Sequence, residues 1–172
     1  MIYTAHYDSP LGRLFLAADE EGLTGLWFEE AAHFADGLPT EREETETPVL
    51  AETKKWLDLY FRGQKPEFLP KLHPVGSKFR QEVWALLQEI PYGRTTTYGA
   101  LAKELAQRQG RTTVSAQAVG GAIGHNRISI LIPCHRVVGS SGSLTGYAGG
   151  LEKKVQLLKL EGVAMEDFSL PK

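Results

Sequence analysis

A single cysteine, Cys134, lies between a proline and a histidine in the run Ile-Leu-Ile-Pro-Cys-His-Arg-Val-Val. One thiol cannot close an intramolecular disulfide, and there is no thiolate cluster for a structural zinc ion. Cys134 is therefore either an inert core residue, as most free cysteines are, or a nucleophile. The next residue, His135, could act as its base.

A nucleophilic thiol must lose a proton, and an ordinary thiol with a pKa of about 8.5 is mostly protonated at neutral pH. Adjacent side chains of an extended segment point apart, so we expect a water to bridge Cys134 and His135. A carboxylate would then orient the imidazole. Glu161, at the end of the last predicted helix, is a candidate that spacing alone does not identify.

Other thiol chemistries fit this chain less well. A cysteine phosphatase needs an arginine six positions after the cysteine, where this chain has Ser140. A redox pair needs a second cysteine, and a papain-like protease needs a distant histidine and different neighbours of the cysteine. A generic thiol hydrolase remains an alternative, which turnover of ester substrates would reveal.

Composition and charge indicate a soluble protein. Of the 172 residues, 42% are apolar, enough for a sizeable core. We find neither a membrane-spanning stretch nor a signal peptide, and a free thiol fits a reducing compartment, so we expect a cytoplasmic protein without membrane association. Residues 91–150 carry one carboxylate, that of Glu104, against six Lys or Arg side chains. This imbalance suggests a surface for an anionic partner, and arginines that pair with the acidic first half are the alternative.

The first part of the chain predicts a small sheet and a helix. Residues 2–8, 14–18 and 23–29 are strand-like runs, and residues 31–46 are expected to be a loop. Thr47-Pro48 has the form of a helix start, with the helix running to residue 62. Residues 63–76, rich in proline and glycine, read as a linker. We therefore expect two domains, at residues 1–70 and 71–172.

The second part predicts mainly helices. Apolar residues at helical spacing follow the linker from Phe79 to Ile90, short helices are expected at 97–107 and 115–123, and an amphipathic helix at 151–161. Residues 126–142 are expected to be extended or looped. The fold class is thus α+β, with a small antiparallel-sheet-plus-helix domain followed by a mostly helical domain that contains a helix-turn-helix and is winged-helix-like.

The short helix at 115–123 consists almost entirely of small residues. Glycine is a poor helix former, so something must approach this backbone closely. Packing against another helix is the common explanation, and insertion into a groove of nucleic acid is the other.

The signature Pro133-Cys134-His135-Arg136-Val137 resembles the active-site motif of the O6-alkylguanine-DNA alkyltransferases, the methylated-DNA–protein-cysteine methyltransferases. The resemblance covers about residues 77–162 and includes further segments in the family's order, Tyr98-Gly-Ala-Leu-Ala, Ala118-Val-Gly-Gly-Ala, Asn126, residues 142–150 and Leu157-Leu-Lys-Leu-Glu161-Gly. It implies that the N-terminal domain is ribonuclease H-like.

The resemblance implies direct-reversal DNA repair. The protein would bind duplex DNA, rotate an O6-alkylguanine out of the stack and transfer the alkyl group irreversibly to Cys134 in a single turnover. O4-alkylthymine is a second candidate substrate. The resemblance implies no cofactor and no metal, and we expect a monomer.

By the same resemblance, Cys134 is the alkyl acceptor, His135 deprotonates it, Glu161 holds His135, and Asn126 braces the segment. The substrate pocket would contain residues that contact the flipped base, namely Tyr98, Tyr147, Ala148, Val137 and Ile123. The hydroxyl of Tyr98 would lie within reach of the purine N3.

The implied DNA-binding residues are Ala116, Gln117, Gly121 and Arg127. Two of them depart from the family's pattern. Many relatives have an arginine where this chain has Gln117, and a proline is common where it has Arg127. Gln117 can fill the gap left by the flipped base but brings no charge.

Two related functions are the alternatives. A non-catalytic protein that binds alkylated bases would share the scaffold but lack the cysteine. A transcriptional regulator would need an additional zinc-binding DNA module, which residues 1–70 do not supply. The presence of Cys134 favours the transferase.

Overall fold

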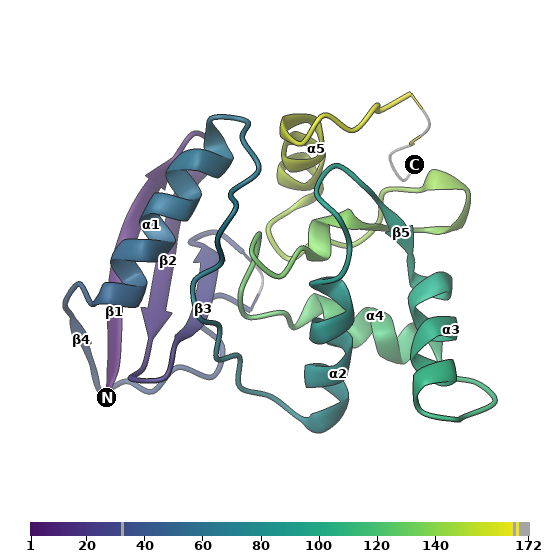
Figure 1. The fold of residues 1–172 in the computed structure, drawn as a ribbon, viewed down its shortest axis with the longest axis horizontal. Coiled ribbons are helices and arrows are strands. Elements are labelled where there is room, and N and C mark those ends of the chain that lie inside the picture. The colour runs from purple at the N-terminus through teal and green to yellow at the C-terminus, as the bar shows by residue number, and fades with distance from the viewer. Residues whose placement is uncertain (32, 167, 169–172) are drawn as a thin grey trace. The chain divides into compact units, whose positions relative to one another are not determined.

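The computed structural model describes residues 1–31, 33–166 and 168. It divides the chain into two compact units. The N-terminal unit contains residues 1–75 and the segment Arg127–Leu131, and the C-terminal unit contains residues 76–126 and the described residues from 132 onward. Figure 1 shows the elements of both units.

The N-terminal unit is built on a four-stranded sheet in the order β3-β2-β1-β4. Its strands are β1 (Ile2–Ser9), β2 (Gly12–Ala18), β3 (Leu23–Phe28) and β4 (Arg42–Glu44). Strands β1, β2 and β3 pair antiparallel, whereas β4 pairs parallel to β1 at the edge. The hairpin between β1 and β2 explains the antiparallel pairing, because two strands joined by a tight turn run in opposite directions.

Both faces of β2 are buried. Phe15 and Ala17 point to one face, where they pack with Trp27 of β3 and are covered by Ala35 and Leu38. The alternate residues point to the other face. Helix α1 (Pro48–Phe61) packs across β1 and β2 and buries Leu50, Thr53, Trp56, Leu57 and Tyr60 (Figure 1). The sheet therefore lies between this helix and the residues Ala35 and Leu38.

A segment far along the chain completes the N-terminal unit. The backbone N–H of Leu26 donates to the carbonyl of Arg127 (2.8 Å), and the N–H of Ser129 donates to the carbonyl of Leu26 (2.9 Å). Ile128 forms a parallel bridge with Leu26 and is fully buried. Residues 127–131 thus lie beside β3 and are joined to it by a single bridge at Ile128.

The C-terminal unit is mainly helical. Its helices are α2 (Lys78–Leu87), α3 (Tyr98–Arg108), α4 (Ala116–Gly124) and α5 (Leu151–Leu160), with the short 3-10 helices η1 (Cys134–Arg136) and η2 (Ser140–Gly142). The strands β5 (Thr96–Thr97) and β6 (Val137–Val138) form a parallel pair. Helices α2, α3 and α4 contact one another, and α5 contacts η1.

The core of this unit fixes α4 against α2 through Trp84. The indole is fully buried, and its Nε1–H donates to the carbonyl of Ala122 in α4 (2.9 Å). Gly76 allows this placement, because a Cβ there would lie 2.7 Å from the indole ring. The contact positions α4, which precedes the Cys134 segment in the chain.

The expected fold class is confirmed, as an α+β fold with a sheet unit followed by a helical unit. Two details differ from expectation. The 31–46 segment contains strand β4, so the sheet is mixed. Cys134, His135 and Arg136 form a 3-10 turn within a segment expected to be extended or looped. In the described part of the chain, no helix is long and apolar enough to cross a membrane.

Candidate active site around Cys134

Cys134 is buried at the start of η1. It follows Pro133, its backbone N–H donates to the carbonyl of Ile132 (2.8 Å), and only 5% of its surface is exposed. Burial raises the pKa of the Cys134 thiol, because a thiolate in an apolar surrounding loses hydration. A hydrogen bond from Asn126 and the positive charge of Lys154 lower the same pKa.

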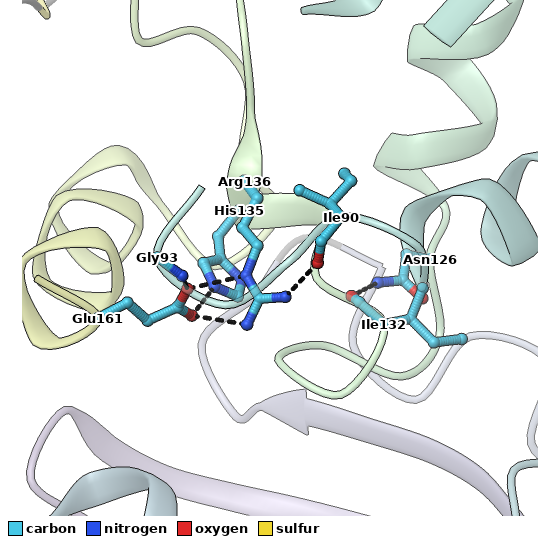
Figure 2. A network of polar contacts seen from close by, with 7 residues as sticks. All are labelled: Ile90, Gly93, Asn126, Ile132, His135, Arg136 and Glu161. Carbon is cyan, nitrogen blue, oxygen red and sulfur yellow. Dashed lines mark hydrogen bonds and ion pairs between the residues drawn. The ribbon is translucent and has the colours of Figure 1, made fainter. Parts of the chain in front are cut away.

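Asn126 links the end of α4 to the Cys134 segment. Its backbone N–H donates to the carbonyl of Ile123, and its side-chain Nδ2 donates to the carbonyl of Ile132 (2.8 Å) (Figure 2). Because the side chain is buried, water does not compete for this hydrogen bond, which holds the turn before Cys134. This contact is the bracing expected for Asn126, and its part in the reaction stays a prediction.

Glu161, directly after α5, receives hydrogen bonds from three residues. His135 Nε2 lies 2.6 Å from Oε2, and the Arg136 guanidinium reaches Oε1 with Nε (2.8 Å) and Oε2 with Nη2 (3.1 Å). The backbone N–H of Gly93 donates to Oε1 (3.0 Å). Figure 2 shows the carboxylate between these donors. The structure thus brings His135 and Glu161 together, as the resemblance implied.

Gly93 is required for this arrangement. Its φ of +77° is rare for residues with a side chain, and a Cβ would lie 3.1 Å from the carbonyl of Glu161. The turn Pro91-Tyr92-Gly93 can therefore bring its backbone close to the end of α5.

Burial favours a neutral His135, although the ring is hydrogen-bonded to a carboxylate. Burial raises the pKa of the Glu161 carboxyl, but hydrogen bonds and charges of His135 and Arg136 outweigh burial and lower the pKa to about 2. An ionised Glu161 only accepts hydrogen bonds, so Nε2 of His135 carries the hydrogen, and Nδ1 is the basic nitrogen. Burial lowers the pKa of His135 against the opposing effect of Glu161. At neutral pH His135 is therefore a base that can take a proton.

Lys154 of α5 is a second buried cation. Its side chain is fully buried, and its Nζ donates to the carbonyl of Thr145 (2.8 Å) and lies 6.0 Å from the centre of the Tyr98 ring. Burial lowers the pKa of Lys154 to about 8, partly offset by attraction to Cys134. Sequence reasoning missed Lys154, although its position was a signal: it lies on the apolar stripe of α5 with Leu157 and Leu158.

Arg136 was also not predicted as a functional residue. It is 8% exposed, and besides Glu161 it reaches the carbonyl of Ile90 with Nη1 (2.7 Å). A charged residue inside the apolar run of the signature was the available signal, because buried arginines need partners.

Tyr98 begins α3 beside the signature segment. Thr96 pairs with Val137 in β5–β6, and Thr97 caps α3, which places Tyr98 next to the strand that follows Cys134. The Tyr98 hydroxyl donates to the carbonyl of Thr145 (3.2 Å). Burial raises the pKa of Tyr98, so the hydroxyl keeps its proton at neutral pH and can donate it.

The other expected pocket residues lie in three places. Val137 is buried in β6 and Ile123 in α4. Tyr147 and Ala148 are half-buried in the loop that follows Gly146. A Cβ on Gly146 would lie 3.8 Å from the Tyr98 hydroxyl, so this loop adjoins Tyr98. Their contact with a substrate stays a prediction.

The exposed side of α4 carries three of the four expected DNA-binding residues. Ala116, Gln117 and Gly121 are exposed, whereas Val119, Ala122 and Ile123 of the same helix are buried. A Cβ on Gly121 would meet no atom within 4 Å, so helix packing does not explain this glycine. Contact of these three residues with DNA stays a prediction.

The fourth expected DNA-binding residue, Arg127, belongs to the N-terminal unit. It is half-buried, and a Cβ on Gly37 would lie 2.7 Å from its guanidinium carbon. The side chain therefore packs against the 31–46 segment, and its role in DNA binding stays a prediction without support from this placement.

Comparison with known proteins extends over both units. The family model of the 6-O-methylguanine DNA methyltransferase DNA-binding domain matches residues 78–163, and that of the 6-O-methylguanine DNA methyltransferase ribonuclease-like domain matches residues 2–73. A methylated-DNA–protein-cysteine methyltransferase of Methanosarcina acetivorans is 43% identical, over 94% of this chain and 99% of that protein. The enzyme of the same name from Haemophilus influenzae is 39% identical, over 96% of this chain and 89% of that protein.

A solved structure gives the same result. The crystal structure of Mycobacterium tuberculosis OGT in complex with DNA is similar with a TM-score of 0.78 and 39% identity, and the match covers 93% of this chain and 91% of that chain.

Proposed function

Because the chain belongs to the O6-alkylguanine-DNA alkyltransferase family, we propose that Cys134 accepts the alkyl group of O6-alkylguanine and that His135, Glu161, Asn126 and Tyr98 assist the transfer. The protein is a methylated-DNA–protein-cysteine methyltransferase that repairs DNA by direct reversal, and its partner is alkylated duplex DNA.

The buried hydrogen bond between His135 and Glu161, next to the only thiol of the chain, carries the assignment of the residues. Nδ1 of His135 takes the proton of Cys134, through a water that bridges the two side chains. The carboxylate of Glu161 stabilises the imidazolium that forms, and Asn126 holds the turn in place.

The thiolate then attacks the alkyl carbon. The S–C bond forms while the bond from that carbon to O6 breaks, and the electron pair of the broken bond stays with guanine. The Tyr98 hydroxyl, at the base's N3, offsets this negative charge, and guanine finally binds the proton that the thiol released. The product is a thioether that neither His135 nor a water can cleave, so each molecule reacts once.

In this proposal, helix α4 binds the DNA. Its exposed face of small residues suits close approach to the minor groove, and Gln117 would occupy the space that the flipped base leaves. Repair of O4-alkylthymine stays a prediction. The cytoplasm is the proposed location, since Cys134 must remain a free thiol.

Intact-mass measurement after mixing the protein with an oligonucleotide that carries one O6-methylguanine tests the proposal. We expect a gain of one methylene, located on the peptide that contains Cys134 and absent from Cys134→Ala. Binding of the modified oligonucleotide without any gain in mass would instead support the alternative of a non-catalytic lesion-binding protein.

A further inference from the structure

Arg136 and Glu161 form a buried ion pair whose geometry leaves little freedom to the carboxylate. Two nitrogens of the guanidinium bind the two oxygens of Glu161, at 2.8 and 3.1 Å, and a third nitrogen binds the carbonyl of Ile90 at 2.7 Å. A planar guanidinium held at both ends fixes the plane of the carboxylate as well as its position. The same carboxylate is the partner of His135.

The ion pair also determines the net charge next to the His135 ring. Without Arg136, the buried Glu161 carboxylate would keep the hydrogen bonds from the Gly93 N–H and His135 but lose its bound cation. A buried carboxylate without a cation strongly favours protonation of its neighbour. With Arg136, the pair of Arg136 and Glu161 is neutral, and His135 gains less from becoming charged.

We propose that Arg136 is a positioning residue of the alkyl transfer, which orients and neutralises Glu161 so that His135 remains a neutral base directed by its Nε2–H. This inference rests on the proposed function and adds a residue to it. Arg136 does not contact the reacting atoms, because its guanidinium is occupied by Glu161 and Ile90. It acts through Glu161.

The groups that influence the protonation of His135 come from several elements. Glu161 follows α5, Arg136 and Cys134 lie in η1 with His135, and Lys154 lies on α5. Tyr92, in the turn after α2, faces the ion pair and has its ring 5.7 Å from the Arg136 guanidinium carbon. Lys154 opposes protonation of His135 as Arg136 does, so the effect of Arg136 must be separated by substitution.

The pH dependence of single-turnover alkyl transfer tests this role, with Arg136→Gln and Arg136→Lys compared with the parent. In Arg136→Gln the loss of the cation should raise the pKa of His135. The acidic limb of the pH–rate profile should therefore shift to higher pH by about one unit or more. Arg136→Lys keeps the charge but not the bidentate contact with Glu161. The acidic limb of its pH–rate profile should therefore stay at the parental pH, while its maximal rate falls by about tenfold.

Two further measurements separate this role from a structural one and from the proposed function. The pKa of His135, followed by NMR without DNA, should rise in Arg136→Gln whether or not the protein transfers alkyl groups. The affinity for the modified oligonucleotide should be unchanged in both variants. Arg13→Gln removes an arginine that pairs with Asp8 and Glu29 at the surface of the other unit, and it should match the parent in rate and profile.

A maximal rate of Arg136→Lys equal to that of the parent would overturn the inference. So would an Arg136→Gln variant whose rate falls equally at every pH without a shift of the acidic limb. If Arg136→Gln does not fold, the maximal rate of Arg136→Lys decides alone. Failure of the parent to gain mass from O6-methylguanine would refute the proposed function, and the NMR result for His135 would still stand.

Discussion

Two buried cations near Cys134 have different partners and therefore different consequences. Arg136 is paired with Glu161, whereas Lys154 donates to a backbone carbonyl and pairs with no carboxylate among the described residues. A buried ammonium without a counter-ion destabilises the folded protein, but its field favours the thiolate of Cys134. At this residue, stability and reactivity should be in conflict.

Replacing Lys154 by Met should stabilise the protein and slow the reaction. The folded-state pKa of about 8 lies below the ordinary value of 10.5. The penalty is thus full below pH 8 and disappears as the pH rises from 8 to 10.5. At pH 7 we expect Lys154→Met to gain about 1–2 kcal/mol in urea unfolding after loss of the bond to Thr145.

The gain should shrink above pH 8, and alkyl transfer should slow by about tenfold as the pKa of Cys134 rises. Lys159→Met, on the exposed side of the same helix, is the control and should change neither quantity appreciably. A less stable Lys154→Met at pH 7, or one with the parental rate, would contradict this account.

At the scale of elements, α4 is notable for what its exposed side lacks. Ala116, Gln117 and Gly121 offer no charge, although most proteins that bind nucleic acid place cations at such a surface. Shape and close approach must therefore supply what charge does not, and the helix should bind DNA with little dependence on salt.

An arginine at the exposed position of α4 should change that dependence. In Gln117→Arg we expect tighter binding to the modified duplex, with a log–log salt slope steeper by up to about 0.9, the value for one additional phosphate contact. Titrations at several salt concentrations measure the slope. Gln156→Arg, which adds the same charge to the exposed side of α5, is the control. Equal slopes for Gln117→Arg and the parent would exclude this interpretation.

Local signals in the sequence identified the helices well. Thr47, Ser115 and Thr97 each cap a helix by accepting from a backbone N–H, and such caps act over three residues. Strand β4 was missed because Arg-Glu-Glu is exposed, charged and without alternation. It is a strand only because its backbone pairs with β1, which no local pattern records.

At the scale of the molecule, the two units are not continuous in sequence. Residues 127–131 pack in the N-terminal unit although they lie between Asn126 and Cys134 of the C-terminal unit. No feature of the sequence indicated this, since pairing with β3 depends on contacts about 100 positions apart. Arg136 and Lys154 each stand at an otherwise apolar position, which is a sequence signal of burial, but their partners depend on tertiary contacts. The signature itself pointed to Cys134 and His135.

Truncation of Ile128 should weaken the N-terminal unit. The side chain is fully buried, so Ile128→Ala should cost about 2–5 kcal/mol. Hydrogen exchange should accelerate at the amides of Leu26 and Ser129, which join this segment to β3. Val75→Ala, at a half-exposed position of the same unit, should leave both amides protected. Unchanged exchange in Ile128→Ala would show that the segment adds no stability.

The excursion of residues 127–131 also limits how such proteins can exchange parts during evolution. A crossover in the linker between two relatives would join one parent's sheet to a C-terminal half that carries the other parent's 127–131 segment. The foreign Ile128 and Arg127 would then have to fit a β3 and a Gly37 with which they did not co-evolve. Viable recombinants should inherit these five residues together with the first 75, so that three genetic crossovers are needed where one linker suggests a single junction.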